Sequence, residues 1–195
     1  MDGQRPEGGR PGRGGAVRAH VVYESMFGNS RAVAHAVAEG LRAALPDADV
    51  TVVNVLEVAD DLRTDVLVVG GPTHAFSMSR PETRASRPTH LTTDEARRAA
   101  ESQPGADAGR GVREWLEQLT AVPAPVAATF DTRVNRPVPK RAASGMARRL
   151  RSAGCRLVAP PQGFFVHGMH GPLADGELDR ATAWGGLVAR AALEG

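Results

Sequence analysis

The sequence is short of the residues on which several common kinds of site depend. Its 195 residues include one cysteine, Cys155, which excludes an internal disulfide and leaves no ligands for a thiolate zinc cluster. No apolar run approaches the roughly 20 residues of a membrane helix. The first residues carry arginine and glycine where a signal peptide carries an apolar segment. We therefore expect a cytoplasmic protein with no membrane partner, and Cys155 as a small buried residue.

Lysine is almost absent, and its absence excludes one class of phosphate site. The phosphate loop of nucleoside triphosphatases needs a lysine that reaches the terminal phosphates, within the pattern GxxxxGK[ST]. The single lysine of this chain, Lys140, stands in no such pattern. The dinucleotide pattern GxGxxG is also missing from the first strand-to-helix turn, which holds one glycine.

Charge is concentrated at the start of the chain. Residues 1 to 18 hold four arginines and two acidic residues, which accounts for the whole formal net charge of +2. The segment 1–17 has too little apolar surface to offset the entropy of ordering it, so we expect a disordered Gly/Arg-rich tail. A nucleic-acid partner is not expected, because the basic repeats are confined to this tail.

Short apolar runs alternate along the chain with segments whose apolar residues recur at helical spacing. This pattern predicts strands and helices in turn. The expected strands are 19–23, 49–55, 65–71, 125–130 and 156–159, the last resuming at 164–166 after Pro160 and Pro161. The expected helices cover about 33–45, 112–119, 145–153 and 178–192, the last capped by Asp175. This alternation predicts an α/β fold, a three-layer sandwich with a five-stranded parallel sheet covered by helices on both faces.

The turn after the first strand has the composition of an anion site. In YESMFGNS, Ser25 and Ser30 supply hydroxyl donors, and Gly28 permits a positive φ angle. The amides of a turn that enters a helix converge on one point, so a phosphate can bind there without a lysine. The same residues also suit an ordinary strand-to-helix turn in which Asn29 or Ser30 caps the helix.

This turn resembles the first loop of the flavodoxins, which runs Ser/Thr-x-Thr-Gly-x-Ser/Thr and cradles the phosphate of FMN. The matching residues here are Ser25, Met26, Phe27, Gly28, Asn29 and Ser30, with Phe27 in place of the middle hydroxyl. The segment GGPTHAF resembles the flavodoxin loop that passes alongside the isoalloxazine ring. It contributes Pro72, Thr73, His74, Ala75 and Phe76, with His74 where flavodoxins often have tryptophan. The third family loop, after the fourth strand, gives Asp131, Thr132 and Arg133.

The resemblance covers roughly residues 18–193 in element order, so we expect one flavodoxin-like domain over residues 18–195. It implies the strand order 2-1-3-4-5 and the cofactor FMN. Together, YESMFGNS, GGPTHAF and FDTR resemble flavodoxin-domain proteins of actinobacteria. The implied function is electron transfer or a small FMN-dependent oxidoreductase reaction, with a redox protein or a nicotinamide as donor. Because Phe27 and His74 depart from the family pattern, a flavin-free module that binds other proteins is the alternative.

Two further segments lie outside the family pattern. Residues 80–110 form a polar, arginine-rich insertion, for which we expect one short helix capped by Thr93. We expect Arg80 or Arg84 to screen the phosphate or to receive an acidic partner, although a solvated excursion fits equally well. The second segment, HGMH, holds His167 and His170, and we expect it to line the flavin pocket rather than to bind a metal.

Overall fold

The computed structural model describes residues 16–74, 77–119, 124–136, 141–168 and 170–194. The expected tail 1–17 therefore lies almost wholly outside the described residues, as do Ala75 and Phe76. Residue 17 is described, and its carbonyl accepts a hydrogen bond from the amide of Asp49.

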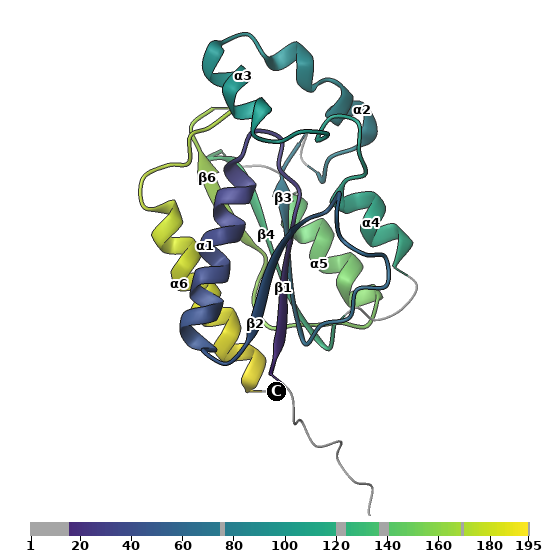
Figure 1. Cartoon of the computed structure of the whole chain (residues 1–195), viewed down its shortest axis with the longest axis vertical. Helices are drawn as coiled ribbons and strands as arrows, with labels where there is room; N and C mark the ends of the chain where they lie inside the picture. The colour runs from purple at the N-terminus through teal and green to yellow at the C-terminus, as the bar shows by residue number, and fades with distance from the viewer. Residues whose placement is uncertain (1–15, 75–76, 120–123, 137–140, 169, 195) are drawn as a thin grey trace, which may run out of the picture.

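A parallel sheet forms the middle layer of the molecule (Figure 1). Its strands are β1 (Arg18–Tyr23), β2 (Asp49–Asn54), β3 (Val66–Pro72), β4 (Val126–Val134), β5 (Arg156–Leu157) and β6 (Gln162–Val166). The order is β2-β1-β3-β4-β5, and β6 also pairs with β4. The predicted α/β fold and its strand order 2-1-3-4-5 are thus confirmed.

The fifth strand of the prediction is split into β5 and β6 by a proline pair. β5 pairs with Val126 and Ala127 at the start of β4, and β6 pairs with Phe130 to Val134 at its end. Pro160 and Pro161 lie between the two pieces and have no amide hydrogen to donate to a ladder. The two pieces therefore follow one strand path beside β4.

Helices cover both faces of the sheet. They are α1 (Asn29–Ala44), α2 (Pro81–Ala85), the 3-10 helix η1 (Arg87–His90), α3 (Asp94–Glu101), α4 (Val112–Gln118), α5 (Ala142–Ser152) and α6 (Glu177–Leu193). In β3, Val68 packs with α1 and α6, whereas its neighbours Leu67 and Val69 pack with α4 and α5. Side chains of a strand alternate between its two faces, so the unbroken aliphatic run fills two cores at once.

Two helix starts differ from the sequence prediction. α1 is capped by Gly28 at φ 85°, not by Asn29 or Ser30, and no side chain caps it. α6 begins behind Gly176 at φ 77°, so the predicted cap Asp175 is wrong. In both places the chain enters the helix through a left-handed glycine, a conformation that costs an L-residue energy.

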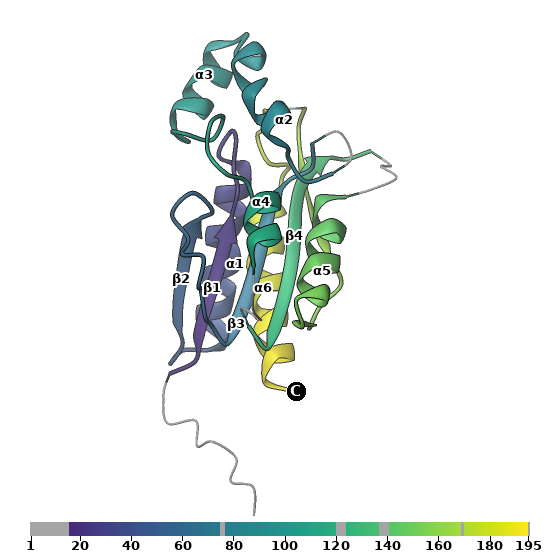
Figure 2. The ribbon, with the colours of Figure 1, turned by 90° about the vertical axis from the view of Figure 1, so that its right-hand side faces the viewer.

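The insertion contains more structure than predicted. α3 begins where expected, with Thr93 Oγ1 accepting from the amide of Ala96 at 3.1 Å. α2 and η1 precede it, and the three helices lie beyond the carboxyl ends of the strands (Figure 2). We call residues 80–111 the cap. None of the helices in the described part of the chain has the length and apolarity to cross a bilayer.

Candidate functional site

A cavity of about 580 Å³ lies where β1, β3 and β4 end, and residues of the cap form part of its lining. Its lining comes from three strand ends, the cap and the segment after β6. The lining residues are Ser25, Met26, Phe27, Asn29, Ser30, Pro72, Thr73, His74, Thr83, Ser86, His90, Thr132, Arg133, Val134, Arg136, Val166 and Gly168. In an open parallel sheet this edge, at the reversal of strand order between β1 and β3, is where ligands bind.

The first loop brings hydroxyl groups to the start of α1. Ser25 Oγ accepts from the amide of Gly28 at 3.1 Å and keeps its own proton. Ser30 Oγ and Thr132 Oγ1 are 2.7 Å apart, so one donates to the other and one proton is left over. The first-turn amides of α1 have no acceptor within the helix. The loop therefore offers donors to an anion, as its sequence indicates.

Thr73 and Asp131 serve a second purpose, which the sequence does not reveal. Thr73 Oγ1 accepts from the amide of Ala142 at 3.0 Å, and Asp131 Oδ2 accepts from that of Ala143 at 3.0 Å. These are the first two residues of α5, so side chains from β3 and β4 cap that helix. α5 consequently starts three residues before the predicted position.

The prediction of a third loop after the fourth strand is wrong, because residues 131–134 are the last residues of β4. Asp131 is fully buried and does not line the cavity, whereas Thr132 and Arg133 do. Burial raises the pKa of Asp131, against the opposing effects of the Ala143 amide and Arg133. Arg133 Nε lies 3.2 Å from Asp131 Oδ1, and its guanidinium stacks over the Phe165 ring at 4.8 Å.

Aromatic rings and imidazoles surround the opening of the first loop. The rings of Phe27 and His170 meet edge to face at 4.7 Å, and His90 of the cap lies 6.4 Å from His170. Asn29 Nδ2 donates to the carbonyl oxygen of His170 at 2.9 Å. His170 thus packs against the first loop, and among the described residues of HGMH it is Gly168 that lines the cavity.

The cap is held in place by a buried arginine. Arg84 is 3% exposed, its Nη2 is 2.9 Å from Glu114 Oε2, and its Nη1 donates to Ser79 Oγ at 3.0 Å. It therefore supports the cap from within, and the expectation that it meets a phosphate or an acidic partner is wrong. Arg80 is exposed and does not line the cavity.

A buried carboxylate lies below the same arginine. Glu24 Oε2 accepts from the amide of Val112, at the start of α4, at 2.9 Å. Burial raises the pKa of Glu24, while Ser79, the Val112 amide and Arg84 act in the opposite direction. Because Glu24 directly precedes Ser25, this network connects the cap to the first loop.

Most of the predicted site residues come together around the cavity, but the cap residues in its lining were missed. Of the predicted set, Gly28 and Asp131 do not line the cavity, and Ala75 and Phe76 are outside the described residues. The missed residues are Thr83, Ser86, His90, Val134, Arg136 and Val166, whereas Gly168 belongs to the segment HGMH that was expected to line the pocket. The only signal for the cap residues was the unusual length of the insertion.

The fold and the place of the cavity put this chain among the doubly wound α/β proteins. Residues 21–97 match the family model described as Flavodoxin. A flavodoxin from the domain Archaea has a TM-score of 0.58 at 21% identity, covering 90% of this chain and 99% of that chain. Oxidised Flavodoxin 2 from Bacillus cereus has a TM-score of 0.60 at 15% identity, covering 89% and 98%. Diflavin flavoprotein A3 from Nostoc sp. has a TM-score of 0.51 at 14% identity, covering 92% and 95%.

The chain has the flavodoxin fold, and its resemblance to the flavodoxin family is confirmed. No curated protein matches it in sequence. Within the described residues, no three His, Cys, Asp or Glu side chains gather as the ligands of a metal ion.

Proposed function

We propose that this chain binds FMN in the cavity that the cap helps to line and acts in electron transfer or in a small oxidoreductase reaction. The observation that carries the proposal is the pairing of Ser30 with Thr132 at the start of α1, beside a cavity of about 580 Å³. That volume is within the range of about 300 to 1,000 Å³ typical of cofactor sites.

The residues present fit each part of this cofactor. The hydroxyl protons of Ser25 and of the Ser30–Thr132 pair, with the first amides of α1, suit a phosphate dianion. Pro72, Thr73 and His74 offer a surface for the ring at the end of β3. Met26 and Phe27 add apolar area on the opposite loop. When bound, the flavin supplies the electron transfer, and the protein supplies orientation and exclusion of water.

The test compares FMN with riboflavin, which lacks the phosphate. We expect the flavin-free protein to quench FMN fluorescence on titration, and Thr132→Ala to weaken FMN by about tenfold or more, because a hydrogen bond to a charged group is lost. Riboflavin affinity should change little. Thr182→Ala, which removes an exposed hydroxyl on α6 that donates to the Leu178 carbonyl, is the matched control.

Two observations favour the flavin-free binding module as the second candidate. Phe27 occupies the position of a phosphate-binding hydroxyl and contacts His170 instead. Ser25 already accepts a hydrogen bond from Gly28 within its own loop. A purified protein that is colourless and leaves FMN fluorescence unchanged throughout the titration would select this candidate.

A further inference from the structure

The charged side chains that line the cavity all have one sign. Arg133 and Arg136 reach it from the end of β4, and no aspartate or glutamate is among the described residues that line it. A cavity enclosed by low-dielectric walls and lined by cations alone concentrates anions. The phosphate is assigned to the hydroxyls and amides of the first loop, so the role of the two arginines is still to be explained.

The two arginines are not equivalent. Arg133 lies against the buried carboxylate of Asp131, so part of its charge is balanced. Arg136 is exposed and forms no ion pair with any residue that the structure describes. Its guanidinium is therefore available to a ligand in the cavity, and its fixed fork suits a carboxylate.

Two histidines complete the polar part of this wall. His74 follows β3, and His90 reaches the cavity from η1 of the cap. Within the part of the chain that is described, the Nε2 atom of His74 is buried and has no hydrogen-bond partner. Burial, His90 and Arg84 lower the pKa of His74, so the ring is a neutral hydrogen-bonding group near neutral pH.

The cap limits what can approach this wall. Thr83, Ser86 and His90 of the cap line the cavity. The cap extends across the carboxyl edge of the sheet (Figures 1 and 2). The hydroxyls of Thr83 and Ser86 donate to carbonyl groups of the cap itself, those of Arg80 and Thr83. Because the free hydroxyl protons of Ser25 and of the Ser30–Thr132 pair are assigned to the phosphate, the arginines and histidines remain to recognise a second ligand.

We propose that the cavity holds a second ligand beside the flavin, a small carboxylate-bearing molecule recognised by Arg136 of the β4 end and His90 of the cap. The proposal rests on the FMN function given above. It assigns the reactant to the class of small organic anions. Arg136 provides the charge, and His90 and His74 provide hydrogen bonds.

The test uses benzoate as the anionic probe and benzyl alcohol as its neutral counterpart. Titrated into the FMN-loaded protein, benzoate should produce a saturable change in the visible flavin absorbance, and benzyl alcohol should produce none. Arg136→Gln should weaken benzoate by about tenfold, as expected for the loss of a charge-assisted hydrogen bond. Its FMN affinity should stay within about twofold of the wild type.

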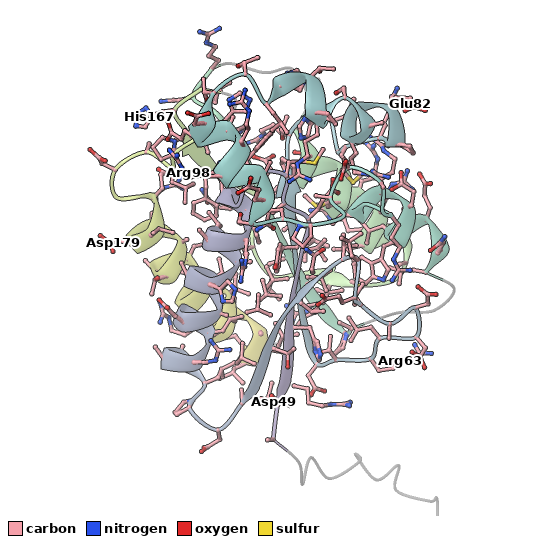
Figure 3. The ribbon with its side chains drawn as sticks, turned by 45° about the horizontal axis from the view of Figure 1, so that its top comes forward. Asp49, Arg63, Glu82, Arg98, His167 and Asp179 are labelled. Carbon is pink, nitrogen blue, oxygen red and sulfur yellow. The ribbon has the colours of Figure 1, made fainter. Side chains whose placement is uncertain are left out.

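Arg98→Gln is the matched control. Arg98 is exposed on α3 (Figure 3) and is not among the described residues that line the cavity. The control should leave both affinities unchanged. The proposal is overturned if benzoate gives no response, if Arg136→Gln does not weaken it, or if that variant weakens FMN as much as benzoate. The last result would place Arg136 in the flavin site.

If the protein does not bind FMN, a different experiment separates the two proposals. If FMN does not bind, benzoate is titrated into the flavin-free protein by calorimetry. Binding that Arg136→Gln weakens and Arg98→Gln does not would retain the anion site without the flavin. The absence of such binding would overturn both proposals.

Discussion

At the scale of single residues, Gly28 controls how the chain turns from β1 into α1. Its φ is 85°, and a Cβ added there would be 3.4 Å from Ser102 Oγ of the cap, so space is adequate and conformation is the constraint. We expect Gly28→Ala to lower the free energy of unfolding by about 1 kcal/mol. Gly28→Asn should cost less, because asparagine tolerates the left-handed region better. Urea unfolding of the two variants measures this order, and equal losses would show that Cβ contacts, not φ, decide.

At the scale of elements, the attachment of the cap depends on charges buried at its base. Arg84→Met leaves Glu24 and Glu114 without their cation, so we expect a loss of about 3 to 5 kcal/mol in the free energy of unfolding. Arg97→Gln is the control, because its pair with Asp94 on α3 is exposed and worth less than about 0.5 kcal/mol. Limited proteolysis should cut the cap of Arg84→Met first. Equal stability of both variants would contradict a supporting role for Arg84.

The contact between α1 and α6 gives a sharper comparison, because two adjacent glycines of α6 differ in what surrounds them. A Cβ at Gly185 would lie 2.2 Å from the carbonyl oxygen of Val37 in α1, whereas at Gly186 the nearest atom is Arg190 Nη1 at 3.4 Å. Gly185→Ala must push the helices apart, and we expect a loss of about 3 kcal/mol. Gly186→Ala should gain about 0.5 to 1 kcal/mol from helix propensity. Thermal unfolding of the pair tests this, and similar effects would contradict close packing at Gly185.

At the scale of the whole molecule, the sequence predicts the sheet far better than the cap. Val66 to Val69 form a continuous aliphatic run because both faces of β3 are covered, and that run is visible without coordinates. The first loop was likewise predictable. Its hydroxyl residues and glycine stand between an apolar strand run and a segment whose apolar residues have helical spacing. The caps of α5 could not be predicted, because Thr73 and Asp131 are far from that helix in the sequence and come from the end of β3 and from β4. Arg84 was misjudged for a related reason: sequence patterns show charge but not burial, and its carboxylate partner lies 30 positions away.

Three imidazoles that are at least partly withdrawn from water contribute to the pH dependence of the fold. Burial is the main cause that lowers the pKa of His20, His35 and His74 from the ordinary value of 6.5. In the unfolded chain these groups take up protons near pH 6.5, but in the folded chain only at lower pH. The contribution of these imidazoles to the free energy of unfolding therefore falls as the pH drops through 6.5 toward the folded pKa values.

Removing one of these groups should reduce that loss. We expect His74→Gln to flatten the decline between about pH 8 and about pH 5.5, by at most the slope of one proton, about 1.4 kcal/mol per pH unit. Urea unfolding of wild type and variant across this range is the measurement. Because His74 lines the cavity, the same series with saturating FMN shows whether the ligand shields it from protonation. Parallel curves for wild type and His74→Gln without ligand would mean that His74 titrates alike in the folded and unfolded chain, and that its imidazole is not withdrawn from water.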